Sequence, residues 1–495
     1  MIKSRISSLI YNKINNDIFK NSFWGILANI LQNLLFSIFF IVIARKYPVE
    51  EFTSYILANS IYAFIVAFSS MGLGQWFVRE LIITNNKLEL IAQFFKIQFT
   101  SGILFYCTNV LLVFTIYDNV IIRNLSLLIG TNIIFDNIIY VITFNNIAHQ
   151  QQKKNFIVLT IEAFLKFTAA CLLFVINIPI LYLSVVLVLL RLTTLSILIK
   201  MGVSYISGIS SILSVKLNWH IYKKILKENW AFILIGSISV IYWRIGILLV
   251  SKYLNNNDVA IYEISYKFFA IAQVLPFIVS TSIYPKFIKS LQSGLDLVKI
   301  LYRKAFLAYT IYGLFVYSFI YSFSDILIPY LFGVKYLATP TFCKEMFFTI
   351  LIFPTVLLQA NLLVSMNFEK LDMKLNLVSL IIHLLICSLG LFFYKTLSIV
   401  NISIFISFLV FHVLQDIILN KLKIISLQHT VLFYSTTFLF ILFFNFSSLF
   451  INKQILFISF WLSLFILSFY CYTKKIFYNN KYFTVYELMF NKNKV

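Results

Sequence analysis

Charged side chains are scarce in this sequence. Only 12% of its 495 residues are Asp, Glu, Lys or Arg, whereas 61% are hydrophobic. A soluble protein of this length needs a polar exterior, and the chain has too few polar residues to form one. With only 13 glycines and 7 prolines, the composition also excludes a disordered or loop-rich chain.

Acidic residues are especially few, with 18 Asp and Glu against 40 Lys and Arg and a formal net charge of +22. A basic balance of this size is typical of proteins that bind nucleic acid. Here the basic residues occur in short clusters between apolar runs. We therefore expect no nucleic acid among the partners.

Cysteine occurs five times, at scattered positions and without a C-x-x-C pair, so neither a disulfide framework nor a zinc site is predicted. The phosphate-binding pattern G-x-x-x-x-G-K-[ST] does not occur either, so the chain is not expected to act as an ATPase by itself. The sequence thus predicts no cofactor, no metal and no catalytic residue.

Long continuous apolar runs are what the sequence has in abundance. They are roughly 20 residues long and do not alternate in hydrophobicity, which favours membrane-spanning helices over barrel strands. We therefore predict an all-α polytopic membrane protein with about fourteen transmembrane helices. The predicted spans are 23–44, 55–75, 97–117, 124–146, 156–176, 178–199, 230–251, 259–283, 304–323, 345–366, 375–394, 397–419, 430–450 and 455–473.

The basic residues orient these spans, because cytoplasmic loops of membrane proteins are enriched in Lys and Arg. With a cytoplasmic N-terminus, most basic residues outside the spans fall on the cytoplasmic side. We therefore expect both termini to be cytoplasmic. The opposite side carries only Arg45, Lys46, Arg123, Lys252, Lys335, Lys344, Lys395 and Lys453.

One long cytoplasmic connection divides the first twelve spans into two sets of six. The expected domains are an N-terminal six-helix bundle (1–202), a basic cytoplasmic linker (203–229), a C-terminal six-helix bundle (230–420), and two extra helices with a basic tail (421–495). Either an amphipathic helix on the inner leaflet or a solvated linker fits the basic segment.

Ionisable residues inside the predicted spans are the main candidates for function. On insertion scales a charge near mid-bilayer costs about 2.5–3.5 kcal/mol, and it usually faces a partner or a wet cavity. Two acid–base pairs are spaced i,i+4 and can neutralise each other, Glu162 with Lys166 and Glu263 with Lys267. The full set is Asp136, Glu162, Lys166, Arg191, Arg244, Glu263, Lys267, His383, His412 and Asp416.

Neutral polar residues also line one face of the first span, where Asn29, Gln32 and Asn33 recur at helical spacing. Their amides suit sugar hydroxyls, although contacts between helices are the commoner use of such residues in lipid. His383 and His412 lie on apolar segments, and we interpret them as packed helix residues and not as metal ligands.

Three stretches resemble the polysaccharide-exporter family that includes the Wzx-type O-antigen flippases, related to MATE and lipid II transporters. They are Ala44 to Tyr55, the segment Ser70-Met-Gly-Leu-Gly74 followed by Arg79-Glu80, and a set from Asn229-Trp230 through Arg244, Val259 to Tyr262, Lys267 and Pro276 to Tyr284-Pro285. The sequence departs from the family's pattern where Pro48, Thr53 and Ala260 replace glycines and Gly246 replaces an acid.

The resemblance implies two six-helix bundles around a central cavity that opens to alternate sides of the membrane. It implies a flippase that moves undecaprenyl-diphosphate-linked oligosaccharide units, such as O-antigen, to the periplasmic face of the bacterial inner membrane. Membrane lipids, a polysaccharide polymerase and a chain-length regulator are the other expected partners.

On this reading the diphosphate and sugar headgroup contacts Arg244, Lys267, Arg191 and Lys166, because guanidinium and ammonium groups suit phosphate oxygens. Asn29 and Asn33 are expected to contact sugar. Asp136, Glu162 and Glu263 are candidates for ion coupling or charge balance.

Other functions stay open at this point. A MATE-type multidrug or ion antiporter and a lipid II flippase share the expected cavity chemistry. A membrane enzyme such as an O-antigen polymerase, ligase or glycosyltransferase needs a large extracytoplasmic surface, and the longest predicted outward loop, 324–344, carries Asp325 as its only well-exposed acid.

Overall fold

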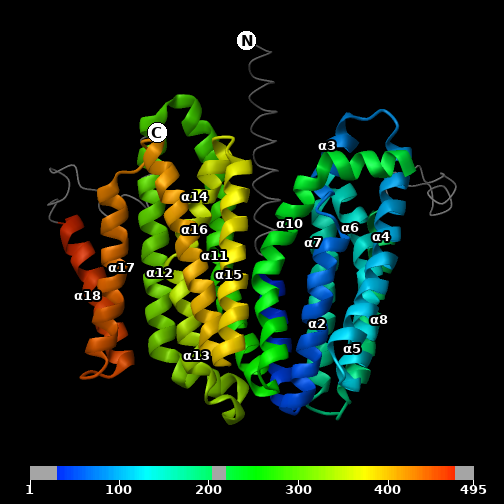
Figure 1. Ribbon diagram of the computed structural model, residues 1–495, viewed down its shortest axis with the longest axis horizontal. Coiled ribbons are helices and arrows are strands. Elements are labelled where there is room, and N and C mark those ends of the chain that lie inside the picture. Colours follow the sequence, from blue (N-terminus) through cyan, green and yellow to red (C-terminus); the bar gives the residue numbers. More distant parts are fainter. Residues whose placement is uncertain (1–29, 203–218, 474–495) are drawn as a thin grey trace. The chain divides into compact units, whose positions relative to one another are not determined.

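The computed structural model describes residues 30–202 and 219–473, and every regular element in these two ranges is a helix (Figure 1). Eleven helices within them are long and apolar enough to cross a membrane. The chain is therefore a multi-pass, all-α membrane protein, as predicted. The other three predicted spans fall on a helix described from residue 30 to 46, on α10 (Trp219–Tyr253) and on α18 (Lys453–Thr473). The count of fourteen and the side of the termini stay predictions.

Two compact units make up the chain, Met1–Ala260 and Ile261–Val495. Besides α10, unit 1 contains α2 (Val49–Ser69), α3 (Gly74–Ile83), α4 (Lys87–Ile116), α5 (Val120–Gly130), α6 (Asn132–Ala148), α7 (Gln152–Leu172) and α8 (Ile180–Gly202). Besides α18, unit 2 contains most of α11 (Asn256–Ser293), and α12 (Leu295–Phe332), α13 (Thr339–Met346), α14 (Phe353–Ser365), α15 (Glu369–Tyr394), α16 (Leu397–Lys421) and α17 (Leu427–Ser447).

The family-like segment Ser70–Gly74 forms the tight turn between α2 and α3. Met71 and Gly72 both adopt positive φ, 54° and 57°, in the region that favours glycine. The amide of Gly74 donates to the hydroxyl of Tyr140 at 2.7 Å, and a Cβ at Gly74 would lie 2.4 Å from the Phe144 ring. Glycine at 74 thus lets the backbone pack directly on α6.

The helix α10 belongs to unit 1, where it packs on α2. The hydroxyl of Thr53 on α2 donates at 2.9 Å to the carbonyl of Asn256, the first residue of α11, and the hydroxyl of Ser251 on α10 lies 2.7 Å from that of Tyr117, which follows α4. Residues 219–229 of the predicted linker form the start of α10, and residues 203–218 lie outside the described ranges. The fourfold division into domains stays a prediction.

A break interrupts the predicted span 345–366 in unit 2, where a 3-10 turn, η2 (Phe347–Leu351), separates α13 from α14. Pro354 stands in the first turn of α14, where a missing N–H is tolerated. The turn packs on α12 at Gly313, where a Cβ would lie 2.8 Å from the carbonyl oxygen of Ile350.

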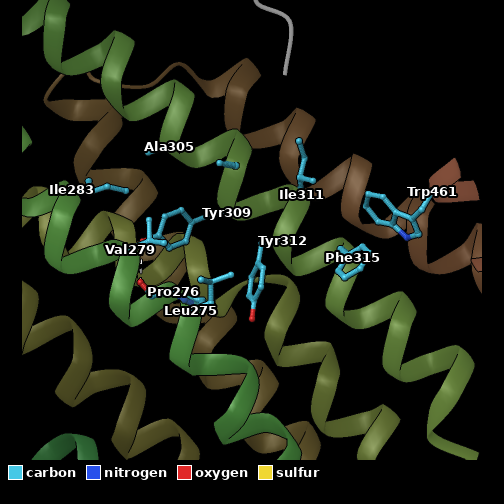
Figure 2. A pocket seen from close by; sticks show the side chains of 11 residues that line it. Leu275, Pro276, Val279, Ile283, Ala305, Tyr309, Ile311, Tyr312, Phe315 and Trp461 are labelled. Atoms are coloured by element: carbon cyan, nitrogen blue, oxygen red, sulfur yellow. Dashed lines mark hydrogen bonds between the residues drawn. The ribbon is translucent and has the colours of Figure 1, made fainter. Parts of the chain in front are cut away.

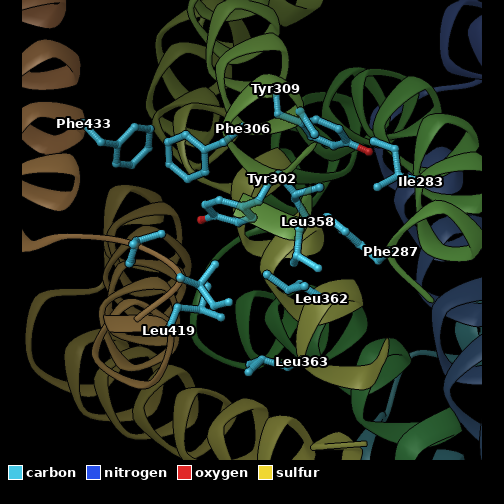
Figure 3. Close-up of a cluster of buried hydrophobic side chains, with 14 residues drawn as sticks. Ile283, Phe287, Tyr302, Phe306, Tyr309, Leu358, Leu362, Leu363, Leu419 and Phe433 are labelled. Carbon is cyan, nitrogen blue, oxygen red and sulfur yellow. The ribbon is translucent and has the colours of Figure 1, made fainter. Parts of the chain in front are cut away.

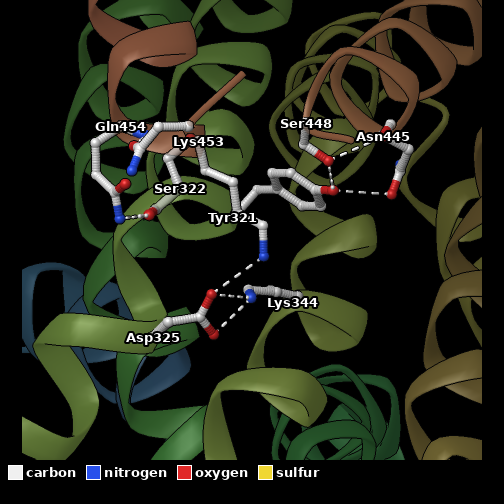
Figure 4. A network of polar contacts seen from close by, with 9 residues as sticks. Tyr321, Ser322, Asp325, Lys344, Asn445, Ser448, Lys453 and Gln454 are labelled. Carbon is white, nitrogen blue, oxygen red and sulfur yellow. Dashed lines mark hydrogen bonds and ion pairs between the residues drawn. The ribbon is translucent and has the colours of Figure 1, made fainter. Parts of the chain in front are cut away.

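Polar contacts join the hairpin of α17 and α18 to α12 and α13 (Figure 4). The carboxylate of Asp325 binds Lys344 at 2.6 Å and Lys453 at 3.3 Å. The hydroxyl of Tyr321 donates to the side chain of Asn445 at 3.1 Å. Deeper in the helix pair, the indole N–H of Trp461 donates to Ser318 at 2.9 Å. These contacts fix the hairpin against unit 2.

Candidate functional site: a charge network inside unit 1

Four of the predicted site residues meet inside unit 1. The guanidinium of Arg191, on α8, lies 2.5 Å from Asp136 of α6 and 2.6 Å from Glu162 of α7. One turn after Glu162, the ammonium of Lys166 lies 2.7 Å from the same carboxylate. The hydroxyl of Tyr62, on α2, donates to the second oxygen of Asp136. The i,i+4 pairing of Glu162 with Lys166 is thus confirmed.

The network is electrically neutral, because two cations balance two carboxylates. Glu162 is only 2% exposed, whereas Arg191 and Lys166 are 19% and 23% exposed. Burial of an ion pair is tolerated when each charge has partners and hydrogen bonds. Chemically, the site presents directed hydrogen-bond donors and acceptors without a net charge, which suits hydroxyl groups.

Hydrogen bonds from side-chain amides join the helices that carry the network. The side chain of Asn146, near the end of α6, donates to Asn155 of α7 at 2.7 Å. Gln32, on the first helix, donates to Thr160 of α7 at 3.1 Å. Lys166 also lies over the ring of Phe36, 5.2 Å from its centroid. The first helix thus contributes both an amide and an aromatic face beside the network.

The other predicted headgroup residues belong to α10, α11 and the first helix. Arg244 is partly exposed on α10 of unit 1, and Lys267 is partly exposed on α11 of unit 2. Glu263, one turn before Lys267, is 7% exposed. Asn33 is exposed on the first helix, and Asn29 lies outside the described residues. The roles of these residues stay predictions.

The two histidines of the predicted spans pack inside unit 2, and both are fully buried. Nδ1 of His383 lies 2.9 Å from the hydroxyl of Ser403, between α15 and α16. His412 lies one turn before Asp416 on α16, and its Nδ1 is 3.2 Å from that carboxylate.

Several partners in these clusters were not predicted from the sequence. Tyr62 is an aromatic residue in an apolar run, where no pattern distinguishes it from a packing residue. The pairing of His412 with Asp416 does carry a signal, because the i,i+4 spacing is the one that indicates the Glu162–Lys166 pair.

An apolar cavity of about 520 Å³ lies between α11, α12 and α18 (Figure 2). Pro276 lacks an N–H, so the carbonyl of Ala272 loses its helical donor, and the hydroxyl of Tyr312 donates to it at 2.5 Å. Tyr309 donates to the carbonyl of Pro276 at 3.1 Å. With their hydroxyls satisfied in this way, both tyrosines contribute rings to the cavity. Leu275 and Phe315 line it too and are exposed, so the cavity opens to the surface of unit 2.

Comparison with known families decides the classification of the chain. Residues 18–291, more than half of the sequence, match the family described as polysaccharide biosynthesis protein. The chain belongs to this family. The family resemblance predicted from the motifs is thereby confirmed. A search of curated protein sequences finds no significant match.

Solved structures of transporters share the fold. The lipid II flippase MurJ in an inward closed conformation is 12% identical with a TM-score of 0.70, covering 92% of this chain and 98% of that chain. An inward-facing multidrug resistance MATE family transporter of the MOP superfamily is 10% identical with a TM-score of 0.66, covering 80% and 96%. A MOP superfamily transporter from Pyrococcus furiosus is 11% identical with a TM-score of 0.57, covering 82% and 96%. The MATE and lipid II flippase-like fold predicted from the sequence is confirmed.

Proposed function

We propose that this protein is a flippase that moves undecaprenyl-diphosphate-linked oligosaccharide units from the cytoplasmic to the periplasmic face of the bacterial inner membrane. Membership of the polysaccharide biosynthesis family supports the glycan part of the proposal. The similarity to a lipid II flippase over 92% of this chain supports transport of a lipid-linked substrate by the same fold. The proposal is one of transport and not of catalysis.

The observation that carries the proposal is the neutral network of Arg191, Lys166, Asp136 and Glu162. A glycan carries many hydroxyls that cannot cross about 30 Å of hydrocarbon unaided. A site rich in fixed donors and acceptors replaces the water that those hydroxyls lose. Because the network has no net charge, we assign it to the sugars and not to the diphosphate.

We assign the diphosphate to Arg244, whose planar guanidinium can bind two phosphate oxygens at once. In the sequence, Arg244 stands where the resembling family has an arginine in its motif. Arg244 is partly exposed, as contact with a headgroup requires.

The apolar cavity beside α18 suits the lipid part of the substrate. A polyprenyl chain has no hydrogen-bonding groups, and the tyrosine hydroxyls at this cavity are already bonded to α11 carbonyls. Contact between the tail and this wall keeps apolar surface out of water while the headgroup crosses.

A deletion strain tests the function directly. Loss of surface polysaccharide is expected, with single lipid-linked repeats accumulating on the cytoplasmic face. Wild-type protein restores export, whereas Arg244→Ala does not, since it removes the diphosphate contact. The matched control is Arg123→Ala, because Arg123 lies at the start of α5 and binds the fully exposed Asp118. Equal membrane levels of the variants must be shown by immunoblot.

Two results would contradict the proposal. If the repeats reach the periplasmic face normally in the deletion strain, the chain is not their flippase. If export is lost but Arg244→Ala restores it fully, the transport function stands and the diphosphate assignment is wrong.

A further inference from the structure

A second buried polar cluster lies in unit 2, apart from the charge network of unit 1. Its centre is the carboxylate of Asp416 on α16, which accepts two hydrogen bonds. Gln359 of α14 donates to one oxygen at 2.7 Å, and Tyr434 of α17 donates to the other at 3.2 Å. Nδ1 of His412 lies 2.6 Å from the hydroxyl of Tyr434 and 3.2 Å from the same second oxygen of Asp416.

The cluster is closed to solvent. His412 and Gln359 are fully buried, and Asp416 is 3% exposed. The ring of Phe433 stacks on His412 at 4.9 Å. Phe306 and Leu419 belong to the surrounding apolar core (Figure 3). The four helices α12, α14, α16 and α17 thus seal a carboxylate among hydrocarbon side chains.

Charge balance distinguishes this cluster from the network of unit 1. There, the permanent cations Arg191 and Lys166 compensate both carboxylates. In the ranges 30–202 and 219–473, Asp416 forms an ion pair with no Lys or Arg, and its basic partner is the imidazole of His412. Leaving a buried charge uncompensated costs several kcal/mol. Histidine is the basic side chain whose charge changes near neutral pH.

Other titratable groups surround the cluster, and His429 of α17 also interacts electrostatically with Asp416. Tyr302 accepts from Gln359 at 3.1 Å, and His429 packs on the Phe306 ring at 4.6 Å. Arg303, on α12, is exposed, so water screens its charge. On α15, Asp372 accepts from Gln415 at 2.9 Å, and His383 is bonded to Ser403.

We propose that His412 and Asp416 together bind one proton, which makes the sealed cluster of unit 2 neutral. The proton is shared by the pair, either as imidazolium beside carboxylate or as imidazole beside carboxylic acid, and both forms have zero net charge. It comes from the aqueous proton pool. Its loss leaves a buried negative charge, which unit 2 relieves by admitting water between α12, α14, α16 and α17.

This site would let proton binding drive transport by the flippase. Only this coupling role rests on the proposed function. Proton binding itself can be measured without any glycan. The two proposals therefore fail in different experiments.

The first test counts protons on the purified full-length protein in lipid nanodiscs. Between about pH 5 and about pH 9, the wild type is expected to release about one more proton per molecule than Asp416→Asn. The variant lacks the carboxylate that shares the proton with His412. The matched control is His383→Gln, a buried histidine on the neighbouring helix whose partner is a hydroxyl, and it should release as many protons as the wild type. Equal counts for Asp416→Asn and the wild type overturn the proposal.

A gentler variant keeps the test decisive if Asp416→Asn does not fold. Tyr434→Phe removes the hydroxyl that donates to Asp416 and lies 2.6 Å from Nδ1 of His412, so the midpoint of proton release should shift. An unchanged midpoint of proton release in Tyr434→Phe overturns the proposal.

Coupling is tested separately in cells whose export has been established. Collapse of the pH gradient should slow export by the wild type and by His383→Gln, but leave the residual export of Asp416→Asn unchanged. If Asp416→Asn exports at the wild-type rate and with the same gradient dependence, the proton site has no part in coupling.

Discussion

Asp136 and Glu162 show how single residues decide whether charged helices can pack in a membrane. Each carboxylate contacts a permanent cation, and Arg191 contacts both of them. Removing one partner from a buried pair typically costs about 3–5 kcal/mol, because the remaining charge stays buried. Replacing one cation and one carboxylate of the network together is therefore expected to destabilise the protein less than replacing the cation alone.

This expectation can be measured by thermal unfolding of the detergent-solubilised protein. Arg191→Gln should lower the unfolding temperature strongly, because it leaves one net negative charge. Adding Asp136→Asn should recover part of the loss, since Glu162 and Lys166 still neutralise each other. Arg79→Gln, at the exposed pair with Glu80, should change little. A double variant as unstable as Arg191→Gln alone would contradict the neutrality argument.

The sequence predicts these contacts unevenly, for reasons of geometry. Glu162 and Lys166 share a helix, so their spacing alone predicts the pair. Arg191 and Asp136 are candidates because charges are costly in lipid, and only tertiary structure shows that they meet. Tyr62 and Gln359 donate to buried carboxylates from other helices, and nothing local in the sequence marks them.

At the scale of helices, apolar runs predict where the chain crosses the membrane but not where each helix ends. The predicted spans 259–283 and 304–323 lie within α11 and α12, which each have 38 residues. A helix can continue beyond the bilayer because water solvates its polar end. Hydropathy detects only the apolar part of such a helix, so it does not predict where the helix ends. The break at η2 likewise depends on packing against Gly313.

A substitution at Gly313 tests that contact between elements. Gly313→Ala places a methyl group 2.8 Å from the carbonyl oxygen of Ile350, so α12 and η2 must move apart. We expect a lower unfolding temperature and a loss of about 1–3 kcal/mol, as for other overpacked sites. Thr310→Ala, one turn earlier on α12, removes only a bond to its own helix and should be nearly neutral. A Gly313→Ala variant as stable as the wild type would contradict this prediction and show that α12 and η2 can move apart at little cost.

At the scale of the whole molecule, the predicted spans place successive loops on alternate sides of the membrane, and the basic residues predict which side is cytoplasmic. Single cysteines in a cysteine-free background test this with a membrane-impermeant maleimide. Lys335→Cys and Asn452→Cys should react in intact cells, whereas Lys153→Cys and Lys421→Cys should react only after permeabilisation. All four positions are exposed. The reverse pattern would invert the orientation, and a mixed pattern would refute the predicted set of spans.

The charge network of unit 1 also has a consequence for the order of biosynthesis. Asp136 leaves the ribosome 55 residues before Arg191, and Glu162 leaves it 29 residues before. At the usual speed of translation, α6 waits on the order of 3 to 10 seconds for its cation. The helix α7 carries its own Lys166 and can enter the bilayer at once. The insertion machinery is therefore expected to shelter α6 until α8 emerges, so that these two helices enter the lipid together.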